Sequence, residues 1–457
     1  MNVNSPVHMV TRLIDSMDLN ALRAARSEAT VPQTFSSASF DVDLETGFFP
    51  RQPLRALTSE FALWEQTLVQ ARNVLKLAAD RGEEALAKAG EGEQWRQRVR
   101  SWPLLDVKKL GSDVTTLRRA HWVLACILHF YIHSLPRTQT EGQTIIPRPL
   151  AVPLYEVSRK INLPPILTFA DIVLWNWEYK NPEQPLTLDN MRYINVFSGN
   201  ETEENFYLLS AAAELKGVEM LRIIERVVNM AGHLDRNAIA SITRDFEQLV
   251  KVIGDLAVIL KEAPKTVHPH TFYWVARPWW NGSDDASPWV FEGIPPNSTP
   301  YLSGASAGQS TVMHALDAFL DVDHALKHAR QPAPSEDNKR AASSNFMQKM
   351  RLYMPAEHRD FLVELQKRQV RDICQRTPAL RAPYNTAVEA LKKFRDAHII
   401  TGTLFIISQA KSQPPASMGI PEAITPKEGQ AMGTGGNPVS TLLKAGRDAT
   451  RRTMLDA

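Results

Sequence analysis

The chain has 457 residues and a formal net charge of +2, and 44% of its residues are hydrophobic. This length can supply two or three domains and a large apolar core. The near-neutral charge gives no support to a nucleic-acid-binding or membrane-surface role, because both need a concentrated basic face. We therefore expect a globular protein whose partners are neither nucleic acids nor membranes.

Two cysteines, Cys126 and Cys374, indicate a reducing compartment rather than a disulfide scaffold. Residues 1–19 lack a continuous apolar core and a small-residue cleavage pattern, so they do not resemble a secretory signal. The most apolar run, residues 123–132, is too short to span a bilayer and contains His129. These features predict a cytoplasmic protein.

Two helices are predicted in the first third of the chain. Apolar residues recur on one face over residues 57–89, and the glycine-containing segment 90–92 is expected to end this helix. The second helix is predicted over residues 115–133, with Ser112 or Asp113 as its N-cap.

The remaining sequence predicts helices throughout and almost no strand. Apolar periodicity predicts helices over residues 166–179, 203–230, 237–262, 309–329, 356–369, 384–409 and 439–450. Asn200 and Glu203 resemble a capping box at the start of the second of these helices. Residues 264–304 are rich in proline and aromatic residues, which is typical of a long, ordered loop with a binding role.

The predicted fold is therefore mostly α, in three parts. Residues 1–40 are polar and irregular and should form a loosely ordered segment. Residues 41–150 should form a small, mainly helical N-terminal domain. Residues 151–457 should form a large helical domain, and the candidate functional residues lie mainly in it.

The helix predicted over residues 384–409 carries one histidine, His398, on its apolar face. Phe394 lies one turn before it and Phe405 two turns after it on the same stripe. Thr401 and Gly402 are small and would leave room for a flat group to approach the helix. A lone histidine on an apolar face is usually a core residue, so the helix alone leaves both a core and an axial-ligand interpretation open.

Other histidines and the common catalytic motifs are less informative. The sequence has no phosphate-binding loop, no dinucleotide-binding glycine pattern and no nucleophile elbow. His268 with His270, and His324 with His328, have spacings that could contact a metal, although surface histidines are the simpler interpretation.

Clusters of aromatic and small residues are better candidates for a binding site than the histidine pairs. Residues 272–274 are three consecutive aromatics, which can hold a flat ring, and Arg277 follows them as a group that can pair with a carboxylate. Residues 304–310 form a small-residue loop at the start of a helix, where free backbone N–H groups could meet an anion. Residues 433–436 form a second glycine loop near the C-terminus.

Several segments, taken in order, resemble the indoleamine 2,3-dioxygenase family of haem enzymes. They are GFFP at 47–50, LRRAH at 117–121, LAVP at 150–153, VSRK at 157–160, LPPIL at 163–167, SAGQS at 306–310, RLYMPAEHR at 351–359 and FRDAH at 394–398. The resemblance covers nearly the whole chain, so it is far more specific than any single motif.

The resemblance implies that the large domain binds haem b, an iron protoporphyrin IX, with His398 as the proximal ligand to iron. A neutral imidazole suits ferrous iron that must bind O₂. Arg395 and Asp317 match a family pair near the haem, and we expect them to form an ion pair. Ser306 and Ala307 match the loop beside a haem propionate, where Ala305 replaces a more usual glycine.

The resemblance also implies a substrate pocket. Its matched residues are Phe206 and Ser210 on the distal side, Phe169, Ile172 and Val173 in the floor, Phe272 and Tyr273 beside the indole, Arg277 at the substrate carboxylate, and Thr434 in a closing loop. Phe169 stands where the family often has tyrosine, and Ile172 where it often has cysteine. The floor is therefore more apolar, which leaves tolerance for substituted indoles open.

The activity implied is cleavage of the indole C2–C3 bond of L-tryptophan with O₂, giving N-formyl-L-kynurenine in the first step of the kynurenine pathway. An external reductant would keep the iron ferrous, and we expect a monomer. No matched side chain is a convincing acid or base, because Ser210 is too weak near neutrality. Open alternatives are a haem mono-oxygenase or dioxygenase acting on a modified indole, a haem protein that binds O₂ or indoles without turnover, and a haem-free helical scaffold.

Overall fold

The computed structural model describes residues 34–456 apart from residues 141, 286, 300–301 and 419–430. The chain divides into two compact units, Met1–Phe35 and Ser36–Ala457, and the fold below is that of the second. Most of the segment predicted to be loosely ordered, residues 1–40, lies outside the described residues. Its last four, Ser37–Phe40, form a single 3₁₀ turn.

Helices make up most of the described chain, as predicted. They are α3 (Ala62–Val74), α4 (Glu83–Arg100), α5 (Val114–His133), α6 (Arg148–Lys160), α7 (Glu201–Met230), α8 (Arg236–Thr266), α9 (Pro269–Thr271), α10 (Thr311–Phe319), α11 (Glu336–Ser344), α12 (Phe346–Arg351), α13 (Ala356–Gln366), α14 (Val370–Arg376), α15 (Pro378–Gly402) and α16 (Val439–Arg451). In this part of the chain, no helix is both long and apolar enough to cross a membrane.

Strands in the described residues are short and form two separate two-stranded sheets. The four in the described residues are β1 (Thr144–Ile146), β2 (Trp177–Tyr179), β3 (Met191–Tyr193) and β4 (Trp289–Phe291). β1 pairs with β4 in parallel, and β2 pairs with β3 antiparallel. The prediction of a mostly α fold is confirmed.

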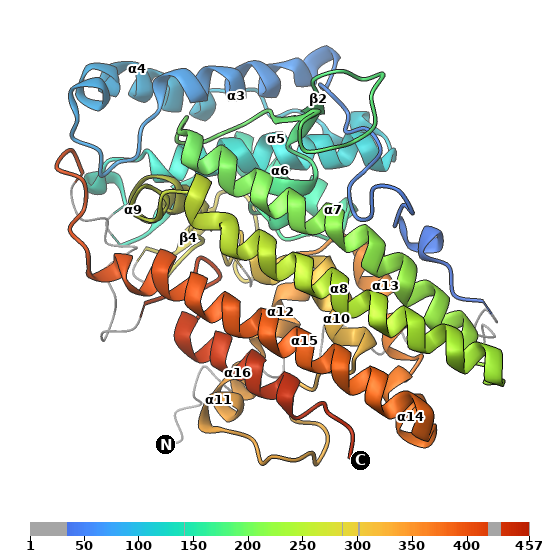
Figure 1. Ribbon diagram of the computed structural model, residues 1–457. Coiled ribbons are helices and arrows are strands. Elements are labelled where there is room, and N and C mark those ends of the chain that lie inside the picture. The colour runs from blue at the N-terminus through green and yellow to red at the C-terminus, as the bar shows by residue number, and fades with distance from the viewer. Residues whose placement is uncertain (1–33, 141, 286, 300–301, 419–430, 457) are drawn as a thin grey trace, which may run out of the picture. The chain divides into compact units, whose positions relative to one another are not determined.

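The first four helices, α3 to α6, pack against one another and lie together in Figure 1. Asp113 caps α5, since its carboxylate accepts a hydrogen bond of 2.8 Å from the backbone N–H of Thr116. From Leu117 onward α5 is almost entirely buried, which explains its continuous apolar sequence. The division of the unit into residues 41–150 and 151–457 remains a prediction.

The predicted break at residues 90–92 is wrong. The first helix ends at Val74, and α4 begins at Glu83 and runs through both glycines to Arg100. A Cβ atom at Gly92 would lie 3.3 Å from Leu75, so this glycine permits close packing of α4 against the end of α3. Gly92 therefore serves packing between helices rather than termination, whereas a Cβ atom at Gly90 would meet nothing within 4 Å.

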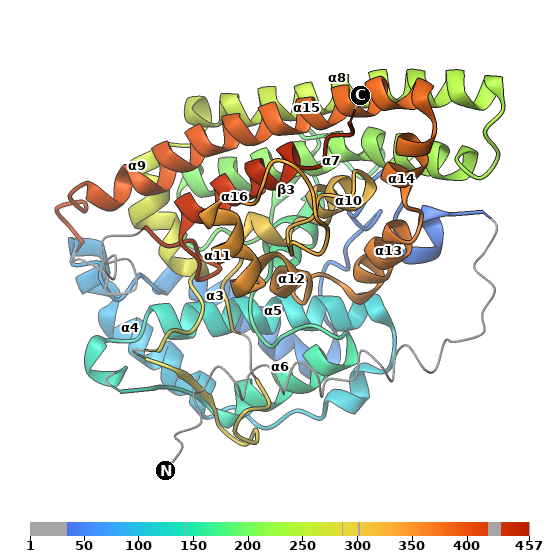
Figure 2. The ribbon, with the colours of Figure 1, turned by 90° about the horizontal axis from the view of Figure 1, so that it is seen from below.

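Three long helices, α7, α8 and α15, form the framework around the candidate site. α8 packs against both α7 and α15, and α16 lies along α15 (Figures 1 and 2). At the start of α7, Asn200 accepts a hydrogen bond of 2.9 Å from Thr202, as expected of a cap. The Glu203 carboxylate instead accepts hydrogen bonds from the backbone N–H groups of Phe197 and Ser198, which ties the incoming chain to the helix.

Three predicted helices have different bounds in the structure. The segment 166–179 is helical only at the π-helical turn Ala170–Leu174 and then forms β2. α10 ends at Phe319 rather than near residue 329, and Asp321 just beyond it has a left-handed φ of 54°. α15 begins earlier, at Pro378, and passes at Thr403 into a π-helical turn, Thr403–Ile407. The predictions contained no helix at α6, α9, α11, α12 or α14.

Candidate active site

His398 lies on α15 and has no hydrogen-bond partner among the described residues. Its ring lies 6.2 Å from that of Phe394, one turn earlier. The ring is half-buried, and the protein packed around it desolvates it. This desolvation, followed by the positive charge of Arg395, lowers the pKa of His398 to about 4. At neutral pH the imidazole is therefore uncharged, with an unused lone pair.

Arg395, three residues before His398, lies at the centre of a buried polar network. It forms the expected ion pair with Asp317 of α10 and also donates to the carbonyl oxygen of Gly446 on α16. The other oxygen of the Asp317 carboxylate lies 2.7 Å from Nε2 of His324. Burial alone would raise the pKa of Asp317, but Arg395 and His324 outweigh it and hold the pKa below its ordinary value. The network fixes α15 to α10 and α16.

The small-residue loop before α10 is held in a defined shape. The hydroxyl of Ser306 accepts a hydrogen bond of 3.2 Å from the N–H of Gly308, and Ala307 is exposed. Gln309 links this loop to the predicted floor, because its Oε1 accepts from the N–H of Phe169 at 2.8 Å and its Nε2 donates to Gly304 at 3.0 Å. Phe169 and the loop are therefore fixed relative to one another.

The other two floor residues, Ile172 and Val173, are buried in the π-helical turn Ala170–Leu174. The hydroxyl of Tyr193 lies 3.3 Å from the carbonyl oxygen of Val173 and 3.1 Å from that of Tyr207 on α7. The turn that carries the floor is thus fastened to α7.

Aromatic rings from four segments meet in one cluster. Phe206 of α7 lies 4.7 Å from Phe272 and stacks on Trp280 at 5.2 Å between centroids. Phe272 also contacts Phe405, two turns after His398, at 5.6 Å. The cluster therefore brings residues predicted for the distal side next to the end of the histidine-bearing helix. The hydroxyl of Ser210 donates to the carbonyl oxygen of Phe206 at 3.0 Å.

Arg277 lies one turn beyond Tyr273 and is 4% exposed. Its guanidinium lies 5.1 Å from the Tyr273 ring and donates to the carbonyl oxygen of Met432. Burial lowers the pKa of Arg277, which interaction with Tyr273 partly opposes. It has no carboxylate partner among the described residues.

The glycine loop near the C-terminus meets the small-residue loop. The hydroxyl of Thr434 donates to the carbonyl oxygen of Ala305 at 2.6 Å, and the N–H of Gly304 donates to the carbonyl oxygen of Thr434 at 3.1 Å. Since Met432 contacts Arg277, this loop connects the guanidinium to residues 304–307. All the predicted site residues thus lie on segments linked by direct contacts.

One expectation about α15 is wrong. A Cβ atom at Gly402 would lie 2.6 Å from Leu443 of α16, so the space beside this glycine is taken by a neighbouring helix rather than left for a flat group. Of the other histidines considered, His324 binds Asp317, and His270 lies 2.8 Å from the carbonyl oxygen of Gln413. Among the described residues, no group of three or more His, Cys, Asp or Glu side chains could hold a metal ion.

Comparison with known proteins identifies the family. A sequence model of indoleamine 2,3-dioxygenase matches residues 36–453. The chain belongs to the indoleamine 2,3-dioxygenase family. It is therefore an oxidoreductase of the dioxygenase type, and the family is haem-dependent.

Individual relatives extend from animals to fungi. Indoleamine 2,3-dioxygenase 1 of Rattus norvegicus is 30% identical over 428 residues, which cover 91% of this chain and 95% of the relative. Indoleamine 2,3-dioxygenase of Saccharomyces cerevisiae is 29% identical and covers 88% of this chain and 90% of its own length. A myoglobin of Haliotis madaka is 28% identical over 370 residues, or 79% of this chain and 87% of the relative.

The residues of this indoleamine 2,3-dioxygenase family member fit a haem group. A metal ligand must be unprotonated, and the low pKa and lack of a partner at His398 meet that requirement. Arg395, three residues before it, forms an ion pair with Asp317, so its charge is already partnered within the protein. Phe394 and Phe405 supply apolar surface on the same helix, as a porphyrin requires.

Sequence reasoning missed a group that fixes the aromatic cluster. The hydroxyl of Tyr207 donates to Oε1 of Glu203 at 2.5 Å and accepts at 3.0 Å from the indole N–H of Trp280, which stacks on Phe206. Tyr207, Glu203 and Trp280 are all buried. Tyr207 adjoins Phe206 in the sequence, but no local pattern indicates that its hydroxyl reaches Trp280.

Proposed function

We propose that this protein is a haem-dependent dioxygenase that cleaves the indole C2–C3 bond of L-tryptophan with O₂ to give N-formyl-L-kynurenine. The observation that carries the substrate assignment is Arg277, a buried guanidinium with no carboxylate partner among the described residues. A buried charge without a counter-ion is costly, so an amino-acid carboxylate at this position would relieve that cost. A bidentate pair would also fix the orientation of the substrate.

The aromatic cluster would hold the indole ring. The rings of Phe206 and Phe272 lie 4.7 Å apart between centroids and are tilted by 48°. Trp280, held by Tyr207, stacks on Phe206 and keeps it in place. Offset or edge contacts with an indole would add to the burial of its apolar surface. With Arg277 at one end and these rings at the other, a substrate with both a carboxylate and a flat ring is selected.

His398 would hold the iron of haem b through its neutral imidazole. The haem, when bound, supplies the activation of O₂ that the side chains cannot supply themselves. Arg395 and Asp317 hold the ligand helix against α10, which limits movement of His398. In this proposal Ser306 and Ala307 lie beside a haem propionate, and an external reductant keeps the iron ferrous.

The protein contributes placement rather than proton transfer. The only hydroxyl among the predicted distal residues, that of Ser210, already donates to the carbonyl oxygen of Phe206. The floor formed by Phe169, Ile172 and Val173 is apolar, which would exclude water from the reacting ring. We therefore assign no general acid or base.

Replacing Arg277 with alanine should raise the Michaelis constant for L-tryptophan by roughly tenfold to one hundredfold, because a hydrogen-bonded charge contributes about 1.5–3 kcal/mol. The Soret band of the haem should be retained. Steady-state kinetics with ascorbate and methylene blue as reductants would measure this. Arg244→Ala, at an exposed position on α8, is the matched control. An unchanged Michaelis constant in Arg277→Ala would show that the substrate orientation is wrong.

A second candidate function is reversible O₂ binding without turnover. It is favoured by the relative that carries the name myoglobin and aligns with 79% of this chain. Formation of formylkynurenine, followed by its absorbance, separates the two. If product forms, mass spectrometry after reaction in labelled O₂ counts the inserted atoms and distinguishes a dioxygenase from a mono-oxygenase acting on a modified indole.

A cytoplasmic location and a monomeric state belong to the same proposal. Cys126 and Cys374 are both free and buried, which fits a reducing compartment. Desolvation raises the pKa of both thiols, so neither is prepared to act as a nucleophile.

A further inference from the structure

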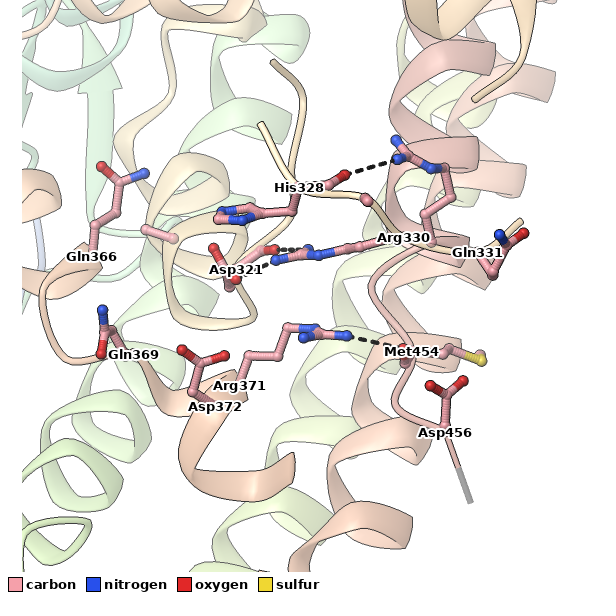
Figure 3. Close-up of a pocket in the computed structure, with 13 residues that line it drawn as sticks. Asp321, His328, Arg330, Gln331, Gln366, Gln369, Arg371, Asp372, Met454 and Asp456 are labelled. Carbon is pink, nitrogen blue, oxygen red and sulfur yellow. Dashed lines mark hydrogen bonds and ion pairs between the residues drawn. The ribbon is translucent and has the colours of Figure 1, made fainter. Parts of the chain in front are cut away.

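A polar cavity lies outside the candidate active site. Its volume is about 430 Å³, and it lies between the end of α10, the segment after it, α14 and the last residues of the chain. In Figure 3, Arg330 and Arg371 extend beside one another, with Asp321 and Asp372 on one side and Met454 and Asp456 on the other. This volume lies within the range of small-molecule binding sites.

Arg330 is already neutralised. Its guanidinium forms an ion pair with Asp321 and donates to the carbonyl oxygen of the same residue at 2.6 Å. The Arg330 side chain is 7% exposed, so this pair forms a fixed wall of the cavity rather than a free charge.

Arg371 and Arg452 are not neutralised in this way. Arg371 donates to the carbonyl oxygens of Thr453 and Met454, at 3.1 and 3.3 Å. Arg452 is 3% exposed and donates through Nε to the carbonyl oxygen of Pro332 at 3.0 Å. Within the described residues, neither forms an ion pair with a carboxylate. Carbonyl dipoles satisfy N–H groups but do not cancel a full charge.

Arg452 also keeps an unused donor. No described residue accepts a hydrogen bond from its Nη1, although that atom is buried. A buried donor without an acceptor is destabilising, and more so when the group is charged. Three aspartates line the cavity with the three arginines, but two of those arginines lack a carboxylate partner in the described part of the chain. One of the two, Arg452, also keeps an unsatisfied hydrogen-bond donor.

We infer that this cavity binds a small anion, a carboxylate or inorganic phosphate, through Arg452 and Arg371. Guanidinium groups pair with both kinds of oxyanion by charge-assisted hydrogen bonds. Asp372 and Asp456 also line the cavity, but they are exposed and solvated. Their charges oppose a dianion more strongly than a monoanion, so a carboxylate is favoured over phosphate.

The test uses the purified full-length protein at constant ionic strength. Butyrate and inorganic phosphate are titrated separately, and binding is followed by calorimetry. Arg452→Gln and Arg371→Gln should each weaken binding of the preferred anion at least tenfold. Arg376→Gln, at an exposed position on the same helix as Arg371, should leave binding unchanged. Tighter binding of butyrate identifies a carboxylate site, and tighter binding of phosphate identifies a phosphate site.

Two further variants keep the test independent of folding defects in the buried arginine variants. Asp372→Asn and Asp456→Asn change exposed side chains only and should tighten anion binding by roughly two- to fivefold, the range expected from one exposed charge. The inference is overturned if neither anion binds. It is also overturned if the arginine variants and Arg376→Gln bind equally well, or if the aspartate variants bind more weakly.

Discussion

Glu214 is a buried carboxyl group one turn beyond Ser210 on α7. Its Oε1 accepts a hydrogen bond from the hydroxyl of Ser310, the N-cap of α10, whereas Oε2 has no partner among the described residues. Burial raises the pKa of Glu214 to about 7, and the hydrogen bond from Ser310 opposes this only in part. The group therefore changes charge near neutral pH inside the unit.

The raised pKa predicts a pH-dependent loss of stability. The unfolded carboxyl has a pKa near 4.5, so between pH 4.5 and 7 the folded state holds a proton that the unfolded state has lost. The contribution of Glu214 to stability should therefore fall by about 3 kcal/mol across this window, at 1.36 kcal/mol per pH unit, and that contribution should remain level above it. Denaturant unfolding of wild type and Glu214→Gln at pH 5 and 8 measures the difference.

Glu214→Gln should lose this dependence. Its unfolding free energy relative to that of wild type should therefore be higher at pH 8 than at pH 5. Glu247→Gln, at an exposed position on α8, should follow wild type at both pH values. A parallel decline of Glu214→Gln and wild type would mean that the carboxyl is not the source.

His121 is a second buried group with a raised pKa, and it contacts the turn that carries the predicted floor. Its Nδ1 lies 2.9 Å from the carboxylate of Asp171, and its Nε2 lies 3.1 Å from the carbonyl oxygen of Pro164. Both neighbours are acceptors, so satisfying both requires a ring that donates from each nitrogen, which is the imidazolium. Desolvation opposes the charge, but the carboxylate of Asp171 outweighs it and the pKa of His121 is raised.

Stability from this pair should be fully present below pH 6.5, the ordinary pKa of histidine, and should be lost as pH rises through the raised folded-state pKa. His121→Gln cannot hold the charge, so its unfolding free energy should lack this loss, while being lower at pH 6 by about 3 kcal/mol. Unfolding measured from pH 6 to 9 tests this. Equal slopes for the variant and wild type would rule out a charged imidazole.

At the scale of elements, glycines inside the long helices have two distinct roles. A Cβ atom at Gly217 of α7 would lie 2.6 and 2.7 Å from the two methyl carbons of Val312 on α10. At Gly254 of α8, a Cβ atom would meet nothing within 4 Å. The first glycine therefore permits helix contact, and the second only weakens its helix.

Gly217→Ala should destabilise the protein by about 1–3 kcal/mol, because Val312 is β-branched and cannot rotate away. Gly254→Ala should instead stabilise it by about 0.5–1 kcal/mol, since alanine is the better helix former. Thermal unfolding of the two variants in parallel measures both, and each serves as the control for the other. If both variants were stabilised, or both destabilised, the two glycines would not have the different roles assigned to them.

The sequence predicts elements well where one long periodic pattern dominates. The helices corresponding to α5, α7, α8 and α16 were predicted close to their bounds, because burial on one face repeats over several turns. The error at residues 90–92 arose because glycine breaks helices in isolation, whereas here Gly92 gives Leu75 its space. The segment 166–179 is apolar throughout, and no periodicity there distinguishes a π-helical turn from a helix or a strand.

At the scale of the whole molecule, the candidate site draws on segments from Phe169 to Thr434. Local spacing suggested only parts of it, such as Phe206 with Ser210 and Phe272 with Arg277. That Gln309 joins Phe169 to Gly304, and that Met432 meets Arg277, follows from tertiary packing that no short motif encodes. The grouping of the remaining residues came from resemblance over the whole chain, and their roles remain predictions.

Because the site links distant segments, haem binding should stabilise the entire unit rather than one helix. A ligand that binds only the folded state adds about 2.7 kcal/mol when its concentration is one hundred times its dissociation constant. Haemin added to wild type should therefore raise the melting temperature and produce a Soret band. His398→Ala should show neither change, since the remaining contacts are apolar and offer no axial ligand, whereas His233→Ala at an exposed position should behave as wild type. An equal haemin-dependent rise in the His398→Ala variant would place the iron ligand elsewhere. A wild-type protein that stays colourless with haemin would contradict haem binding altogether.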